Sequence, residues 1–137
     1  MKNIAVTEAF DWRTRIFDTI PFPALILSTE KIIISANNAF LKKKNTDLDR
    51  VVGKTCHHVF YQMAIPCSAA ICPFSKVIAE KKAHSTFRRM EPEGNEEVWV
   101  DRMFSPILDE NGNVKFIMEC VRDVTRMISL EKRSIHM

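Results

Sequence analysis

Three cysteines and two histidines lie in one short stretch of the chain and are residue types that bind metal ions. Cys56, Cys67 and Cys72 fall within 17 residues, and His57 and His58 directly follow the first of them. Thiolates together with imidazole suit zinc or iron, and thiolates also hold iron–sulfur clusters. Adjacent residues on a helix point roughly 100° apart, so at most one histidine joins such a site. The candidate metal ligands are therefore Cys56, Cys67, Cys72 and His57.

Two other interpretations of these cysteines stay open. Free cysteine is among the most buried residue types, so all three could be packing residues. Cys67 and Cys72 could instead form a reversible disulfide. A Cys72 thiolate at the helix start would be favoured by the helix dipole. A nucleophile at Cys56 with a histidine neighbour as its base is disfavoured, since adjacent residues rarely align and no carboxylate partner is evident. We do not expect an enzyme.

The elements that precede and hold this stretch are short. Apolar residues at helical spacing predict an amphipathic helix from Thr7 to Ile20, which the following prolines end. Two β-prone runs, Ala24–Ser28 and Ile32–Ala36, have hairpin spacing and should pair antiparallel. Asn37 and Asn38 can cap a short helix.

Two further helices are expected before the last third of the chain. Asp47 to Val52 indicates a short helix or turn ended by Gly53. Pro73 suits a first helical turn and opens a helix of about three turns with Lys81 and Lys82 near its C-terminal end.

The last third of the chain is rich in strand-forming residues. Residues 83–90, 96–108 and 114–124 predict three consecutive antiparallel strands, and Asn111-Gly112 favours a type I′ hairpin between the last two. Alternation puts Cys120 on one face with Phe116 and Met118, which we interpret as packing. Thr125 to Ile135 predicts a final helix that points out of the domain.

This element order predicts an α+β fold, with a five-stranded antiparallel sheet and helices packed on one face. The expected divisions are an N-terminal helix in residues 1–22, a core in residues 23–124 and a C-terminal helix in residues 125–137. The chain has 137 residues, 46% hydrophobic and 27% charged, which is typical of one soluble domain.

Composition also limits the partners and the compartment. The net charge is +3, and the basic run Lys42 to Lys44 is more typical of a solvated helix end than of nucleic-acid contact. No run approaches the roughly 18 to 20 apolar residues of a membrane span, and no signal peptide is evident. We expect a cytoplasmic protein with its cysteines as thiols or ligands.

The chain resembles the PAS family from about Arg15 to Arg133. Four pieces carry the resemblance: Ile16 to Ile20 before a proline, IIISANNAF from Ile32 to Phe40, PILDENG from Pro106 to Gly112, and Asp123-Val124-Thr125.

The resemblance implies that Asp123 and Thr125 close the last strand ahead of a signalling helix. That helix would feed an effector such as a histidine kinase, a cyclic-dinucleotide enzyme or a sigma-54-type transcriptional activator. A strand that leads straight into an outgoing helix can act as a lever for small sheet movements.

Residues 53–74 are similar to a bacterial PAS subset with a Gly-x-x-Cys segment followed by two further cysteines, the last before a proline. Cys56, Cys67 and Cys72 match those positions. The subset has two residues between its second and third cysteines, whereas this chain has four.

The resemblance also implies a small-molecule site between the sheet and the helices, for which the alternative is a packed core. A flavin photosensor is not expected, because the reactive-cysteine segment is missing, and no histidine is singled out as a haem ligand. Arg102 could present a guanidinium to an anionic group such as a carboxylate. The expected pocket residues are Val77, Phe87, Trp99, Arg102, Met103, Phe104, Phe116 and Met118.

These observations predict a sensory module that converts a small ligand or redox state into movement of its C-terminal helix. The alternative is a metal or iron–sulfur redox sensor built on the cysteines. Apolar stripes on both flanking helices further predict a homodimer.

Overall fold

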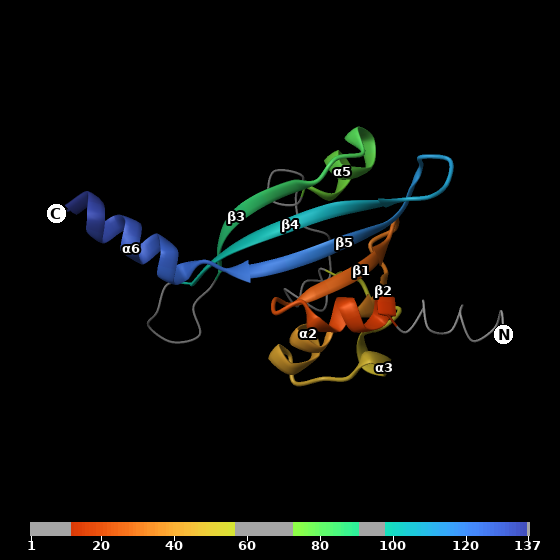
Figure 1. Cartoon of the computed structure of the whole chain (residues 1–137), viewed down its shortest axis with the longest axis horizontal. Coiled ribbons are helices and arrows are strands. Elements are labelled where there is room, and N and C mark those ends of the chain that lie inside the picture. Colours follow the sequence, from red (N-terminus) through yellow and green to blue (C-terminus); the bar gives the residue numbers. More distant parts are fainter. Residues whose placement is uncertain (1–11, 57–72, 91–97, 137) are drawn as a thin grey trace.

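The computed structural model describes residues 12–56, 73–90 and 98–136. Five antiparallel strands form one sheet in the order β2-β1-β5-β4-β3, so the first and last strands are neighbours at its centre (Figure 1). This confirms the predicted α+β class and the five-stranded sheet. The strands are β1 (Ala24–Ser28), β2 (Ile33–Ala36), β3 (His84–Met90), β4 (Val98–Leu108) and β5 (Val114–Asp123).

Short helices cover one face of this sheet. Residues 12–19 are helical and lead into β1. The helices between the strands are α2 (Asn38–Lys43), α3 (Leu48–Val51) and α5 (Phe74–Glu80). Each contributes buried side chains to the core on the same side of the sheet, which we call the inner face: Phe40, Val51, Phe74 and Val77.

Asn37 is fully buried and joins three segments of the first half of the chain. Its Oδ1 accepts hydrogen bonds from the backbone N–H of Ala24 at 2.9 Å and of Phe40 at 3.0 Å. Its Nδ2 donates to the carbonyls of Phe22 at 2.9 Å and Ile20 at 3.3 Å. The predicted capping of α2 is therefore confirmed, and the same side chain ties the end of the N-terminal helix to β1.

Two local predictions were wrong. The β4–β5 connection is not a type I′ turn, because Gly112 has a positive φ of 79° whereas Asn111 does not. Asp109 organises it instead, with Oδ1 accepting from the N–H groups of Asn111 and Asn113. Helix α5 has seven residues rather than three turns, because Lys81 takes a left-handed conformation at its C-terminal end.

Side chains alternate between the inner face and an opposite outer face along every central strand. Strand pairing places Leu25, Phe104 and Glu119 on one side of the sheet. It places Ala24, Met103 and Cys120 on the other. The outer face is also largely apolar, since Phe87 is 61% exposed and Met103 is 45% exposed.

Helix α6 (Thr125–His136) follows β5 directly and extends away from the sheet (Figure 1). Its first residue is bonded to β4, whereas Met127 and Leu130 expose their side chains. None of the described helices is long and apolar enough to cross a membrane.

Candidate ligand site and signalling junction

An ion pair lies at the centre of the inner face with no exposure to solvent. Arg102 on β4 and Glu119 on β5 are both 0% exposed, and Arg102 Nη2 donates to Glu119 Oε2 at 3.2 Å. The guanidinium also lies 5.0 Å from the centroid of the Phe104 ring. Alternation brings the pair together, because Arg102 is two residues from Phe104, which is opposite Glu119 in the β4–β5 ladder.

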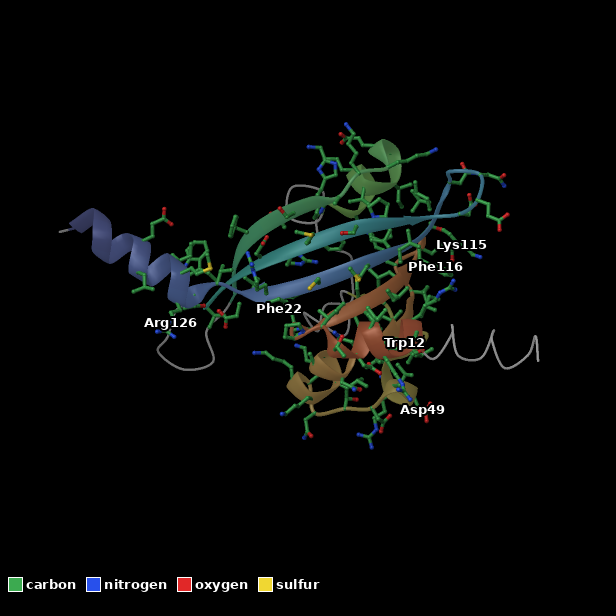
Figure 2. The ribbon with its side chains drawn as sticks, in the orientation of Figure 1. Trp12, Phe22, Asp49, Lys115, Phe116 and Arg126 are labelled. Carbon is green, nitrogen blue, oxygen red and sulfur yellow. The ribbon has the colours of Figure 1, made fainter. Side chains whose placement is uncertain are left out.

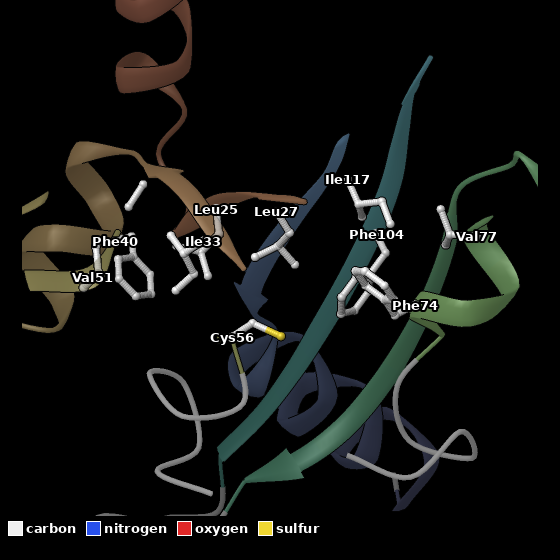
Figure 3. Packing of buried hydrophobic residues seen from close by; sticks show 11 residues of the cluster. Leu25, Leu27, Ile33, Phe40, Val51, Cys56, Phe74, Val77, Phe104 and Ile117 are labelled. Atoms are coloured by element: carbon white, nitrogen blue, oxygen red, sulfur yellow. The ribbon is translucent and has the colours of Figure 1, made fainter. Parts of the chain in front are cut away.

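Apolar side chains lie beside this pair on β1 and α5, whereas Thr86 lies opposite Arg102 on β3. Leu25 is opposite Glu119 in the β1–β5 ladder, and Leu27 is opposite Ile117. Helix α5 adds Phe74 and Val77, and Figure 3 shows them on the same side of the cluster as Phe104. The ion pair is thus a fully buried charged group beside the apolar core.

The carboxylate of Glu119 is incompletely bonded within the part of the chain that the structure describes. Its Oε1 is buried and has no hydrogen-bond partner there. Burial raises the pKa of the Glu119 carboxyl, while the charge of Arg102 and its hydrogen bond offset part of that rise. A buried acceptor without a donor is costly, and such groups commonly mark a site for a water, an ion or a ligand.

The structure divides the predicted pocket residues between the two faces. Val77, Arg102 and Phe104 are buried on the inner face. The expectation that the others point inward is corrected, because their register positions lie on the outer face. These outer-face residues are Phe87, Trp99, Met103, Phe116 and Met118.

On β5 the cause of this error is a phase shift of one residue. Sequence alternation correctly placed Phe116, Met118 and Cys120 on one face, but that face is not the one covered by helices. A shift of one position moves every side chain of a strand to the other side. Glu119 was missed for the same reason, and the signal that could have found it is a lone carboxyl opposite Phe104 in the hairpin register.

The cysteine interpretation is only partly covered by the described residues. Cys56 is buried in the core cluster beside the inner face (Figure 3). Cys67, Cys72 and His57 lie outside the described residues, so the metal and disulfide hypotheses stay predictions. Within residues 12–56, 73–90 and 98–136 no three potential ligands gather closely enough to hold a metal ion.

Cys120 is half-buried on the outer face. Burial raises the pKa of its thiol, although the nearby Arg122 charge counteracts this. Arg122 is exposed and pairs with Asp101 at 3.4 Å across the same two strands. The β4–β5 pair therefore carries one buried ion pair inside and one partly exposed ion pair outside.

Asp123 and Thr125 form the junction between the sheet and α6. The Thr125 N–H donates to Asp123 Oδ1 at 2.9 Å. Thr125 Oγ1 accepts from the Trp99 N–H at 2.9 Å and donates to the Trp99 carbonyl at 3.4 Å. Burial alone would raise the pKa of Asp123, but the hydrogen bonds from Thr125 and the charge of Lys43 together lower it. The first residue of the exit helix is thus held by both central strands.

The fold and this geometry define a class of protein: a small α+β domain with a polar pair inside its sheet and an exit helix bonded to the same strands. The PAS fold family model matches residues 17–127. The chain therefore belongs to the PAS family, whose domains are generally sensory modules rather than enzymes.

Solved structures of low sequence identity share the fold. The PAS domain of BvgS from Bordetella pertussis is 17% identical with a TM-score of 0.64, covering 98% of this chain and 99% of that one. A sensory box sensor histidine kinase structure from Vibrio cholerae is 18% identical with a TM-score of 0.60, covering 90% and 98%. An RNA-binding light-oxygen-voltage receptor is 19% identical with a TM-score of 0.67, covering 93% and 38%. A sequence search of curated proteins gave no match.

Proposed function

We propose that this chain is a sensor that receives a small organic ligand on the inner face of its sheet and relays its presence through α6 to an effector. The ligand would lie against Arg102, Glu119 and Phe104. The effector would be a signalling enzyme or transcriptional activator of the kinds expected from the sequence.

The observation that carries the proposal is that β4 contains both a member of the buried ion pair and the residue bonded to the start of α6. Arg102 belongs to the buried ion pair, and Trp99 donates one hydrogen bond to Thr125 Oγ1 at the start of α6 and accepts one from it. The two residues are three positions apart, which is about 10 Å along a strand. A ligand that shifts β4 would therefore act directly on the helix junction.

The partner strand gives the same connection. Glu119 and Asp123 lie four positions apart on β5, and Asp123 accepts the Thr125 N–H. Both members of the ion pair are therefore on strands that hold the exit helix. Such a lever needs only a small sheet displacement to move what the helix carries.

Purification of the chain from its cells, followed by denaturing extraction and mass spectrometry, tests ligand binding. A near-stoichiometric small molecule is expected, and it should be lost from a variant carrying Arg102→Met and Glu119→Leu. A matched control replaces the outer pair with Arg122→Met and Asp101→Leu and should keep the molecule.

Amide hydrogen exchange of α6 tests the relay. Exchange in α6 should differ between the ligand-loaded and ligand-free chain, and Thr125→Val should abolish that difference. Identical α6 exchange in both states would contradict signalling through the helix, and an empty chain would contradict ligand sensing.

Homodimerisation is a second part of the proposal. Trp12 and Ile16 are 65% and 59% exposed and are one helical turn apart on the N-terminal helix. The outer face of the sheet offers Phe87 and Met103 as exposed apolar partners. Two apolar surfaces on one small chain favour association between copies.

A further inference from the structure

We propose that the inner-face site selects an uncharged ligand that donates a hydrogen bond from an N–H or O–H group to Glu119 Oε1. This inference rests on the proposed function, because it names the ligand class for the same site. It differs from the carboxylate ligand that the guanidinium of Arg102 suggested from the sequence.

Charge balance is the first argument. The positive charge of Arg102 is matched by the carboxylate of Glu119 at 3.2 Å, and both are buried. No third charged side chain among the described residues is fully buried. An anion would meet the carboxylate and a cation would meet the guanidinium, so each would lose its hydration without a net opposite charge.

Hydrogen-bond balance is the second argument. Oε2 of Glu119 accepts from Arg102, whereas Oε1 has no donor in the described part of the chain. An ionised carboxylate is only an acceptor, so the missing partner must be a donor. Hydrogen bonds to charged groups are stronger than neutral ones, especially where water is excluded.

The surroundings define the rest of the ligand. Leu25, Phe104 and Ile117 flank the pair on the inner face. A mostly apolar body with one donor group matches this arrangement. A neutral amide or a nitrogen heterocycle with an N–H group has this chemistry.

Four probes with the same ring and nearly the same shape test the inference: benzamide, acetophenone, benzoate and benzamidine. They are a neutral donor, a neutral acceptor, an anion and a cation. Binding to the ligand-free chain is measured by NMR in mildly alkaline buffer, about pH 8, with the carboxyl carbon of Glu119 confirming ionisation. Benzamide is expected to shift resonances of β4 and β5 and to bind at least about tenfold more tightly than the others.

Charge variants provide the second readout. Glu119→Gln leaves the Arg102 charge without its carboxylate, so the preference should move from benzamide to benzoate. Asp101→Asn makes the same change in the outer ion pair and should leave the preference unaltered. If Glu119→Gln does not fold, Arg102→Met with Glu119→Leu should fold and bind benzamide and acetophenone equally, because replacing both members of a buried pair is tolerated.

The outcomes separate this inference from the proposed function. Equal binding of acetophenone, or preference for benzoate by the unaltered chain, would overturn the ligand class while leaving an inner-face site. No shift of β4 or β5 by any probe would overturn the inference and the inner-face site together. The relay through α6 is decided separately by its hydrogen exchange.

Discussion

At the scale of single residues, a buried Arg–Glu pair is a poor way to stabilise a small domain. Removing two charges from water costs several kcal/mol, and a buried ion pair commonly only offsets that cost. Arg102 and Glu119 are nevertheless fully buried beside the apolar core. The proposed role in ligand recognition would explain why polar groups occupy a position where leucine and methionine would pack.

Glu119 predicts how stability depends on pH. Folding raises its pKa, so the native chain keeps this proton to higher pH than the unfolded chain, whose carboxyl has the ordinary value of 4.5. The contribution of this proton to the free energy of unfolding is fully present below the unfolded pKa and is lost as pH rises through the folded pKa. The free energy of unfolding then falls by at most about 1.4 kcal/mol per pH unit.

Urea unfolding at a series of pH values measures this contribution. The variant with Arg102→Met and Glu119→Leu should lack it, whereas Asp101→Asn should retain it. Arg102 is the charged group that faces Glu119, and its charge partly offsets the rise in the Glu119 pKa. An unfolding free energy whose pH slope is the same in the wild type and the double variant would contradict the prediction.

The cysteines make a separate prediction at this scale. If Cys56, Cys67 and Cys72 bind zinc or iron, protein purified without oxygen should contain near-stoichiometric metal that is lost when all three are changed to serine. Elemental analysis with an absorption spectrum measures this. Metal-free protein with a flat visible spectrum would exclude the redox-sensor alternative.

At the scale of secondary-structure elements, Asn37 and Thr125 connect the two flanking helices to the sheet. Asn37 bonds the residues that follow the N-terminal helix. Thr125, the first residue of α6, is hydrogen-bonded to β4. Each uses a polar side chain to bond backbone groups of another element. The two ends of the domain are thus attached by hydrogen bonds as well as by apolar packing.

Asn37→Ala is expected to reduce the free energy of unfolding by about 2 to 4 kcal/mol. The substitution removes the cap of α2 and leaves the Ala24 N–H and the Phe22 carbonyl without this partner. Denaturant unfolding monitored by circular dichroism measures the loss. Asn38→Ala, at the exposed neighbouring position, is the control, and equal effects of the two would disprove this role.

Thr125→Val should loosen α6 without unfolding the sheet. It removes the two side-chain hydrogen bonds to Trp99, worth about 1 to 2 kcal/mol together. Amide protection of Ile128, whose N–H bonds the Val124 carbonyl, is expected to fall roughly tenfold. Thr29→Val in the exposed β1–β2 turn is the control. Unchanged protection at Ile128 would show that the junction does not depend on this hydroxyl.

At the scale of the whole molecule, apolar side chains remain outside the core at both flanking helices and on the outer face. Figure 2 shows Trp12 on the N-terminal helix and Phe22 where this helix leads into β1. Because the inner face already packs against α2, α3 and α5, these side chains are available to a second copy.

Ile16→Lys is expected to convert a dimer into a monomer. A charge at this exposed apolar position would have to be desolvated in the interface. Sedimentation velocity distinguishes the 15.8 kDa monomer from a species of twice that mass. Thr29→Lys adds the same charge in the β1–β2 turn and should not dissociate the dimer. A monomeric wild type at high concentration would contradict self-association.

The sequence by itself determined the elements and their order, because the information for them is local. Prolines ended the first helix, Asn37 capped the next one, and alternating apolar residues predicted each strand to within a few positions. Together with Asp123-Val124-Thr125, these signals were sufficient to predict the family. The β4–β5 loop was predicted as a turn, but its type depends on the hydrogen bonds of Asp109.

Only the tertiary structure decided which face of the sheet is inside. Both faces of β5 carry apolar residues, so alternation separates Phe116 and Met118 from Ile117 without saying which side the helices cover. The partner of Arg102 is Glu119, 17 positions away on the next strand. Their contact depends on hairpin register, and burial of both charges depends on packing of segments distant in sequence, which no local pattern of residues specifies.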